Sequence, residues 1–423
     1  MIIGISGPFC DNNFGDYTML INNIYDFMDS DVQIDKIIIF CYEKSLVQDL
    51  CRDYFNSYNV EVFELKISIE RADQNSFMGV DHTDDCFTPM EILRTVQNIE
   101  DLHNVIQNVD LMVSCGGGHF DYYWLGLKRR YRLFSIIAPC IVARHLHKNV
   151  VMLGHSFGPW GNNKEFFLGL FNYINFDAIN CRDNLYSKKN LNAICVTDNI
   201  HEVCDDLSLI NNRIDNLVRN KKNNFSNYYI LDIYSSIQDI EHNIEDIISF
   251  VQKMKEERGL IPVFIPHGPE YNGARQSKLL KKYIPELIVY ESERNYLPPE
   301  EFILLLKDAH FVLCEHYHSF VLALTHKVPA IMFIRKIDGN HFYYYNKTVG
   351  FLKISGVLSK SEIGEELFCT LSLPELFDSS EVFNTKIEKI KAILSEFSFE
   401  LGDKKKDYIR YILNICEGGG IRK

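Results

Sequence analysis

Short runs of β-branched and other apolar residues alternate along the chain with longer segments whose apolar positions recur with helical spacing. The short runs predict strands and the longer segments predict helices. The first half contains predicted strands at Ile2–Ile5, Ile37–Cys41, Val60–Leu65, Leu111–Ser114, Val150–Leu153, Ala178–Cys181 and Ile194–Thr197. The periodic segments between them include Tyr17–Met28 and Pro89–Asn108. Because the strands lack strict in-and-out alternation and helices separate them, we expect a parallel sheet covered on both faces.

The same alternation returns after a segment rich in Asn and Lys, which has the composition of a linker. Strands are predicted at Tyr228–Tyr234, Ile261–Ile265, Leu287–Tyr290, Phe311–Cys314 and Ala330–Phe333. Helices are predicted at Ile240–Arg258, Gly273–Tyr283, Pro298–Lys307 and Ser319–Thr325.

These patterns predict an α/β protein with two Rossmann-like domains, whose parallel sheets face a central cleft. We place the domains at residues 1–215 and 228–380 and the linker at 216–227. A mostly helical segment, 381–423, is expected to pack back on the domains. In open α/β sheets ligands bind beyond the carboxyl ends of the strands, so polar residues and glycines directly after strands are the candidates for chemistry.

The composition and net charge narrow the classes of molecule that this chain could bind. The 423 residues are enough for two cores, and the net charge of −13 disfavours general binding to nucleic acid or to an anionic membrane. No apolar run reaches the roughly 18–20 residues of a membrane span. The start, MIIGISGPF, has the pattern of a strand and not of a signal peptide. The 12 cysteines are scattered without a C-x-x-C pair, so we expect reduced thiols and a cytoplasmic protein.

Glycine-containing turns follow three of the predicted strands. The first, Gly7–Asp16, leads into a helix whose free N–H groups would favour an anion, although a plain turn capped by Asn13 or Asp16 explains it equally well. The second, Ser114–Asp121, reads SCGGGHFD; its glycines would let a ligand approach the backbone, or would simply make a tight turn. The third is GHSFGPWG at Gly154–Gly161.

Charged and imidazole side chains also follow strands. Arg182 is placed to bind a carboxylate or phosphate. His316 and His318 lie between a predicted strand and a helix, where a general acid or base is often found, and His267 would project into the same cleft. Two histidines at this spacing could bind a metal, but no Cys or carboxylate set with metal-ligand spacing accompanies them, so we expect none.

Six short motifs resemble, in order, those of the polysaccharide pyruvyl transferase family. They are N-F-G-D at Asn13–Asp16, the triple glycine with Phe120 beyond it, G-x-x-x-G-P at Gly154–Pro159, C-R-D-x-x-x-S at Cys181–Ser187, Asp205–Asp206, and H-x-x-x-x-A-L-x-x-x-V-P-A at His318–Ala330. The resemblance implies a fold similar to B-type glycosyltransferases. It also implies transfer of the enolpyruvyl group of phosphoenolpyruvate to a sugar, giving a cyclic pyruvate ketal on a cell-surface glycan or its lipid-linked precursor.

One position departs from the family. His316 stands where the family's Arg-x-His pattern has Arg, and neutral His lacks both the permanent charge and the fork of donors. Either the substrate's charge keeps His316 protonated, or Arg335, Lys336 or Lys347 supplies the positive charge. Alternatively, donor use has changed or activity is lost.

The resemblance and the strand-end positions together suggest roles for individual residues. The acid that protonates the methylene carbon is expected to be His318, and the proton acceptor for the sugar hydroxyl is expected to be Asp16 or Asp121. For the donor we expect binding by Arg182, His316, Lys336, Asn13 and the glycines Gly116, Gly117 and Gly118. For the acceptor we expect His119, His267 and the aromatic residues Tyr343 and Tyr344.

No cofactor is expected beyond phosphoenolpyruvate as co-substrate, and the expected partners are that donor and a glycan. The run Lys404–Lys406 would most simply be a solvated helix start, or else a weak contact with a membrane that carries a lipid-linked acceptor. Two alternatives stay open, because one fold hosts many functions. One is a nucleotide-sugar glycosyltransferase in which Glu315 binds the ribose and Arg335 and Lys336 bind the diphosphate. The other is a degenerate binding protein.

Overall fold

The computed structural model describes residues 1–69, 85–127, 129–194, 197, 199–219, 221–268, 273–336, 342–358, 364–373, 380–397 and 401–417. The chain forms two units, each built around one sheet. The first contains Met1–Asp11, Asp16–Asp206 and Leu401–Lys423, and the second contains Asn12–Gly15 and Leu207–Glu400. This confirms the predicted α/β class with two parallel sheets.

The sheet of the first unit is parallel throughout its described strands. They follow the spatial order β3-β2-β1-β4-β6-β7-β8, and β5 pairs with β6 beside this path. Their bounds are β1 (Ile2–Ser6), β2 (Lys36–Cys41), β3 (Val60–Glu64), β4 (Leu111–Ser114), β5 (Gly117–Phe120), β6 (Asn149–Phe157), β7 (Ala178–Cys181) and β8 (Ile200–His201).

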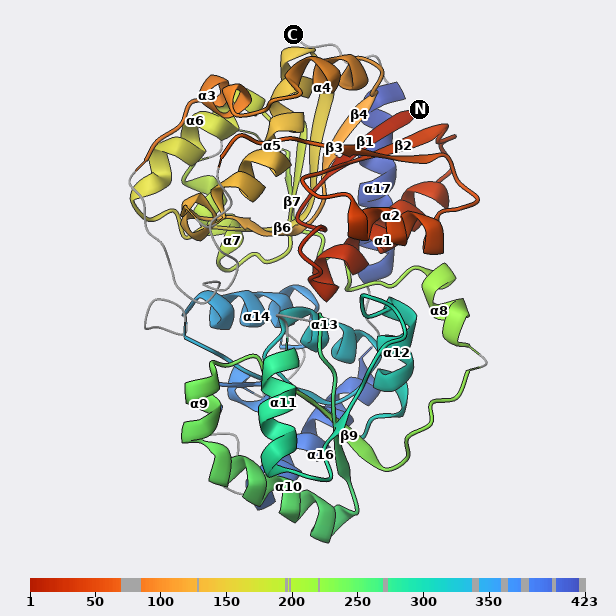
Figure 1. Cartoon of the computed structure of the whole chain (residues 1–423), viewed down its shortest axis with the longest axis vertical. Helices are drawn as coiled ribbons and strands as arrows, with labels where there is room; N and C mark the ends of the chain where they lie inside the picture. The colour runs from red at the N-terminus through yellow and green to blue at the C-terminus, as the bar shows by residue number, and fades with distance from the viewer. Residues whose placement is uncertain are drawn as a thin grey trace. The chain divides into compact units, whose positions relative to one another are not determined.

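Helices cover both faces of this sheet (Figure 1). One of them, α5, is buried on all sides from Arg130 to Ala143, which fits a mostly apolar sequence. Its buried Arg132 pairs with Asp11 at 2.9 Å. The helices that belong wholly or mostly to this unit are α1 (Phe14–Met28), α2 (Ser45–Tyr54), α3 (Pro89–Arg94), α4 (Ile99–Ile106), α5 (Arg130–His145), α6 (Lys164–Ile174), α7 (Ser187–Asn192) and α17 (Leu401–Glu417), with 3₁₀ turns η2 (Tyr122–Leu125) and η3 (Gly161–Asn163).

The second unit repeats the architecture with a smaller parallel sheet, ordered β11-β10-β9-β12-β13-β14 among the described residues. Helix α10 packs on β10, and α13 packs on β12 and β13. The strands are β9 (Tyr228–Asp232), β10 (Ile261–Phe264), β11 (Ile288–Val289), β12 (Val312–Cys314), β13 (Ala330–Phe333) and β14 (Cys369–Thr370). The helices are α8 (Asn212–Val218), α9 (Ile237–His242), α10 (Ile244–Arg258), α11 (Ala274–Tyr283), α12 (Pro299–Asp308), α13 (Tyr317–Thr325), α14 (Phe342–Ile354) and α16 (Ser380–Glu396), with a 3₁₀ turn η4 (Glu365–Leu367).

Several elements differ from the sequence prediction. The single helix expected at 89–108 is two helices, because Val96 leaves the helical path to pair with Ile67 in an isolated bridge. Half of the predicted strand Ile194–Thr197 lies outside the described residues, and its described residues Ile194 and Thr197 are not in a strand. The strand beside β7 is β8. The triple-glycine segment, expected to be a ligand loop, instead contributes Gly117 and Gly118 to strand β5, which pairs with β6.

The units also divide at other positions than expected. The chain passes from the first to the second at Asp206, before the expected end at 215, because α8 packs on α12 and Lys307 contacts Asp215 at 2.9 Å. The C-terminal segment is shared: α16 belongs to the second unit and α17 to the first.

Helix α17 is anchored by a buried lysine. The ammonium of Lys405 lies 2.5 Å from the carboxylate of Asp26 and donates to the backbone carbonyl of Asp206 at 2.8 Å. The hydroxyl of Tyr408 donates to the carbonyl of Met152 at 2.6 Å. The run at 404–406 is therefore not a uniformly solvated helix start, since its central residue holds α17 against the first unit.

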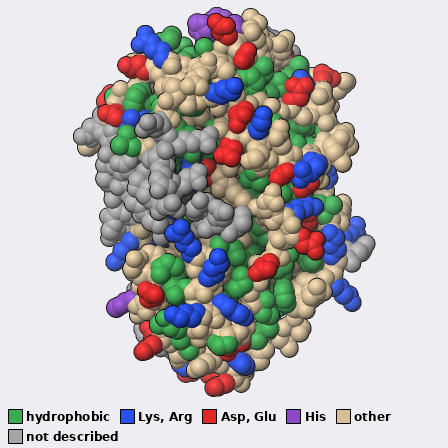
Figure 2. All heavy atoms as spheres, in the orientation of Figure 1, with side chains coloured by type: hydrophobic (Ala, Val, Ile, Leu, Met, Phe, Trp, Pro, Cys, Tyr) green, Lys and Arg blue, Asp and Glu red, His purple; other side chains and the backbone are tan. Residues whose placement is uncertain are grey.

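Among the described helices, none combines the length and apolarity needed to cross a membrane. On the face shown in Figure 2, Lys and Arg side chains are interspersed with Asp and Glu side chains. The acidic net charge is therefore not segregated from the basic side chains on this face.

Candidate active site

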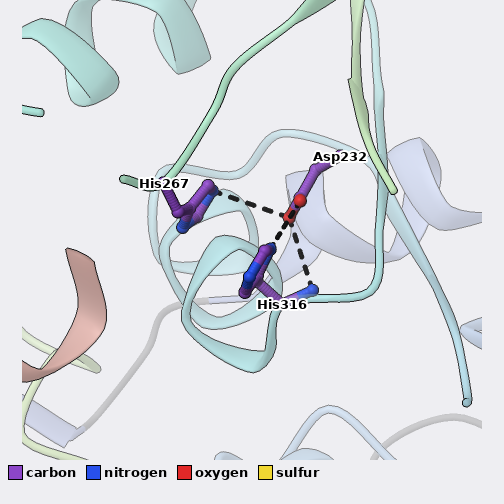
Figure 3. A group of neighbouring side chains, drawn as sticks. All are labelled: Asp232, His267 and His316. Carbon is purple, nitrogen blue, oxygen red and sulfur yellow. Dashed lines mark hydrogen bonds and ion pairs between the residues drawn. The ribbon is translucent and has the colours of Figure 1, made fainter. Parts of the chain in front are cut away.

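The carboxyl ends of three neighbouring strands of the second unit bring a carboxylate and two imidazoles together (Figure 3). Asp232 ends β9, His267 follows β10, and His316 follows β12 as the residue that precedes α13. The Oδ1 atom of Asp232 lies 2.6 Å from Nδ1 of His316, and its Oδ2 atom lies 3.6 Å from Nε2 of His267. Adjacent parallel strands end at the same edge of a sheet, which is why residues so far apart in sequence meet here.

Ser319 completes the hydrogen bonding of this cluster. Its hydroxyl lies 2.8 Å from Oδ2 of Asp232, to which it donates, and 2.9 Å from Nε2 of His267. The backbone N–H of His316 also points to Asp232, at 3.3 Å. Asp232 and His267 are each 1% exposed, whereas the His316 side chain is 17% exposed. His316 is therefore the member of the cluster that can reach a ligand.

Burial and charge set the protonation of the buried members. Burial alone would raise the pKa of Asp232, but the attraction and hydrogen bonds of the histidines and of Ser319 lower it to about 2. Burial lowers the pKa of His267 to about 3, aided by repulsion from His316. At neutral pH the cluster thus contains an ionised Asp232 and a neutral His267, which leaves the carboxylate to orient His316.

The same three residues offer ligand atoms within 4.8 Å of one another, which is a donor set for a divalent metal. Their rings do not suit one ion as they stand. The planes of His267 and His316 are parallel within 7° and stacked with centroids 4.2 Å apart. An imidazole binds a metal in its own plane at about 2.0–2.1 Å, and two stacked planes share no such point. A bound metal would require one ring to turn; the arrangement suits a hydrogen-bonded pair.

His318 lies in the first turn of α13 against the beginning of α1. A Cβ atom built on Gly15 would lie 1.8 Å from Nδ1 of His318, so only glycine allows this approach. The preceding Phe14 has its ring 5.0 Å from the ring of His267, edge to face. Asn12 donates to the carbonyl of Asn295 at 2.8 Å. The segment Asn12–Gly15 thus belongs to the second unit, where it meets two of the predicted histidines.

Other predicted residues of the N-terminal motif have local roles. The Asn13 side-chain oxygen accepts from the N–H of Gly15 at 3.3 Å, which is an Asx-type turn at the start of α1. Asp16 lies in the first turn of α1, is 9% exposed and groups with the first unit. Its role as proton acceptor stays a prediction.

Glu315 is enclosed by hydrogen bonds. Its carboxylate accepts from the backbone N–H of Tyr234 and from the hydroxyl of Ser235. Burial raises its pKa to about 7. Since these internal donors engage both oxygens, the structure gives no support to Glu315 as a ribose ligand.

The residues predicted on and beside α14 lie close together. Tyr344 accepts a hydrogen bond from Nη2 of Arg335 at 2.9 Å, while Tyr343 is 8% exposed. Lys336 is exposed, and its role in donor binding stays a prediction. Arg335, which the sequence offered only as a substitute for the missing arginine, is thus better placed in this group than Lys336.

The glycines of the first unit make room for a carboxylate of the chain itself. A Cβ atom on Gly116 would lie 2.4 Å from Oδ2 of Asp206, and one on Gly154 would lie 2.8 Å from its Oδ1. Asp206 accepts from the N–H of Gly154 at 2.9 Å and from the amide of Asn23 at 2.8 Å. The space beside Gly116 is therefore filled from within. Donor binding by Gly116, Gly117 and Gly118 stays a prediction that these contacts do not favour.

His119 and Asp121 are both engaged inside the first unit. His119 lies on β5 with no exposed surface, packed against Phe120, Trp124 and His155, and burial lowers its pKa well below its usual range. Asp121 caps η2, accepting from the N–H groups of Tyr123 and Trp124 at 2.9 and 3.2 Å. Acceptor binding by His119 and proton transfer to Asp121 stay predictions that these internal contacts do not favour.

The C-R-D-x-x-x-S motif also has a structural explanation. Arg182 is fully buried, bonds the hydroxyl of Ser156 at 2.5 Å and pairs with Asp205 at 3.0 Å. Asp183 accepts from the N–H and the hydroxyl of Ser187 at the start of α7. Because Asp205 already neutralises Arg182, direct contact of Arg182 with a donor stays a prediction that its burial does not favour.

Asp232 and Ser319 were missed by the sequence analysis. The available signal for Asp232 was a charged residue inside an otherwise apolar strand run. Ser319 was read only as the first residue of a helix, and nothing in the sequence links it to residue 267.

Comparison with known proteins agrees with the motif order and with the fold. A model of the polysaccharide pyruvyl transferase family matches residues 13–336. No curated protein matches the chain. Among solved structures, UDP-GlcNAc 2-epimerase from Methanocaldococcus jannaschii is similar with a TM-score of 0.57 and 14% identity, covering 98% of this chain and 100% of that one. UDP-GlcNAc 2-epimerase from Neisseria meningitidis, bound to UDP-GlcNAc, is similar with a TM-score of 0.56 and 11% identity, covering 98% and 99%. These likenesses show the fold, which is the B-type glycosyltransferase fold predicted from the sequence.

Proposed function

The chain belongs to the polysaccharide pyruvyl transferase family, and from this premise we propose that it forms pyruvate ketals on a glycan during synthesis of a surface polysaccharide. The donor is phosphoenolpyruvate, and the acceptor is a sugar with two suitably spaced hydroxyls, on an oligosaccharide or a lipid-linked precursor. Membrane contact would be peripheral, through such an acceptor.

One observation carries the proposal: His318 is held against Gly15 beside the Asp232, His267 and His316 cluster. A histidine between a strand end and a helix, with its ring fixed by backbone packing, is suited to deliver a proton to a defined atom. The neighbouring carboxylate–imidazole pair supplies a second oriented imidazole. Ketal formation needs an acid that protonates phosphoenolpyruvate. It also needs hydrogen-bond donors for the carboxylate and phosphate groups of phosphoenolpyruvate.

In the reaction we propose, His318 gives a proton to the methylene carbon of phosphoenolpyruvate, which leaves positive charge at the adjacent carbon. A sugar hydroxyl adds to that carbon and loses its proton to a carboxylate, for which Asp16 is our candidate. Phosphate then leaves with the electron pair of its C–O bond and takes up the proton held by the carboxylate. A second hydroxyl of the same sugar replaces it and loses its proton to His318, which restores the acid. His316, oriented by Asp232, would hold an anionic group of the donor during these steps.

The test compares His318→Asn with the wild type. We expect the variant to lose phosphate release from phosphoenolpyruvate in the presence of a glycan acceptor, and to lose the acid-labile pyruvate that mass spectrometry would detect on the product. The matched control is His310→Asn, since His310 is an exposed histidine of the same unit. Full transfer by a folded His318→Asn protein would show that His318 is not the acid.

A second arm tests the donor. Because a ligand that binds only the folded state raises the melting temperature, thermal melting with phosphoenolpyruvate and with UDP-GlcNAc separates the two donor classes. Stabilisation by UDP-GlcNAc alone would favour the glycosyltransferase alternative over pyruvyl transfer.

A further inference from the structure

Two cations of the second unit lie on the faces of tyrosine rings near the candidate active site. Arg335 follows β13, and its guanidinium carbon lies 4.7 Å from the ring centroid of Tyr234 and 5.1 Å from that of Tyr344. Lys347 lies on α14, and its ammonium is 4.1 Å from the ring centroid of Tyr317 and 5.8 Å from that of Tyr344. Tyr344 and Lys347 are three residues apart and therefore share one face of α14. The ring of Tyr344 thus lies near Lys347 as well as near Arg335.

Each cation is one ring away from a histidine of the site. The ring of Tyr234, on whose face Arg335 lies, has its centroid 4.8 Å from that of the His316 ring. The ring of Tyr317, on whose face Lys347 lies, has its centroid 5.3 Å from that of the His318 ring. Both positive charges therefore lie close to the residues proposed for donor binding and proton transfer.

The rings hold Arg335 without neutralising it. Among the described residues no carboxylate lies within ion-pair distance of its guanidinium. Glu315 attracts Arg335 from a greater distance, and its own oxygens accept hydrogen bonds from Tyr234 and Ser235. A tyrosine face attracts a cation but adds no negative charge, and it leaves the N–H groups at the guanidinium edge able to donate. A half-buried cation of this kind is most stable when an anion binds it.

We propose that Arg335 and Lys347 form an anion site for a phosphate or carboxylate group, with Arg335 binding it directly and Lys347 adding charge. The identity of the anion as phosphoenolpyruvate rests on the proposed function. The site supplies the permanent positive charge that His316 lacks, and it lies wholly within the second unit. Tyr344 acts as a positioning residue, because its hydroxyl accepts from Nη2 of Arg335.

Calorimetric titration with phosphoenolpyruvate, with inorganic phosphate and with UDP-GlcNAc tests this site. We expect Arg335→Gln to weaken binding of phosphoenolpyruvate and phosphate by at least about tenfold, because a charge-assisted hydrogen bond is lost in a partly desolvated place. Arg335→Lys should recover only part of the affinity, since it keeps the charge without the fork. Lys347→Gln should weaken binding, whereas Lys353→Gln, an exposed lysine of the same helix, should not.

The outcomes separate this inference from the proposed function. Unchanged phosphoenolpyruvate affinity in folded Arg335→Gln would overturn the anion site and leave pyruvyl transfer standing. If the wild type binds UDP-GlcNAc but not phosphoenolpyruvate, and Arg335→Gln loses that binding, the anion site stands and the proposed donor is wrong. Absence of binding to all three ligands would overturn the site. If Arg335→Gln does not fold, Lys347→Gln and Tyr344→Phe decide, with a loss of affinity expected in each and unchanged affinity in both refuting the site.

Discussion

Replacing Gly15 with alanine should move the imidazole that we assign as the acid. The added methyl carbon would lie 1.8 Å from Nδ1 and 2.4 Å from Cγ of His318, whereas atoms in van der Waals contact are separated by about 3.5–4 Å. The overlap is too large for the ring to absorb in place. Either the His318 ring turns away from its position or the segment Asn12–Gly15 shifts within the second unit.

The effect of Gly15→Ala on the free energy of unfolding is the sum of two opposing contributions. Overpacking of this kind typically costs about 1–3 kcal/mol, and alanine in a helix is favoured over glycine by about 1 kcal/mol, so the net loss of unfolding free energy should be no more than about 2 kcal/mol. A displacement near 1 Å at a catalytic group can cost on the order of 100-fold in rate. Gly15→Ala should therefore remain folded and lose most of its transfer activity.

The assay is phosphate release from phosphoenolpyruvate with a glycan acceptor, beside thermal melting of each variant. Gly169→Ala is the matched control, because Gly169 lies in helix α6 with no atom within 4 Å of the added Cβ, and it should gain about 0.5–1 kcal/mol of stability with unchanged activity. Adding Gly15→Ala to His318→Asn should cost no further activity, since both act on one group. Wild-type activity in Gly15→Ala, or additive losses in the double variant, would refute the assignment.

Two further outcomes concern stability. The pKa of Glu315 is raised by burial from 4.5 to about 7, so its contribution is fully present below pH 4.5 and is lost as the pH rises through 7; Glu315→Gln should remove a fall of about 3 kcal/mol across this window. Urea midpoints measured from pH 4.5 to 8 check this, and parallel curves for variant and wild type would contradict it. Lys405→Met should cost about 3–5 kcal/mol and expose the amides of α17 to hydrogen exchange, because Asp26 loses its buried partner. The exposed Lys404→Met variant is the control, and equal protection of α17 in both variants would argue against this anchor.

Most of the strands that sequence patterns located are buried on both faces, where a parallel sheet demands a continuous apolar run. The exceptions are β3 and β11, which were predicted although they are only partly buried. Strand β5 escaped this rule because it reads Gly-Gly-His-Phe and pairs along only part of β6. Strand β14 is two residues long and gives no period to detect. The helix boundary near Val96 depended on pairing with Ile67, a contact between residues that local periodicity does not report.

The candidate site was predicted in part, for a physical reason that applies to strand ends. His267, His316 and His318 were found because polar residues directly after parallel strands gather at one edge of the sheet. Asp232 was missed because it lies inside the run predicted as strand Tyr228–Tyr234, so it did not stand out as a polar residue directly after a strand. The glycines at and beside Gly116 could be interpreted in two ways. The absence of a Cβ atom indicates that another group approaches closely, but it does not tell whether that group is a ligand or a side chain such as Asp206.

The two units differ in the groups that surround their buried cations, and this difference indicates where an anionic donor would bind. In the first unit Arg132, Arg182 and Lys405 are each paired with an aspartate, so each pair adds little net field. In the second unit Arg335 lies instead on the faces of two tyrosine rings, which stabilise a cation and leave its charge in place. A protein with a net charge of −13 repels a small anion unless positive charge is kept locally uncompensated. The tyrosine rings around Arg335 achieve this, which is why we propose donor binding there and not at the arginine that the C-R-D motif suggested.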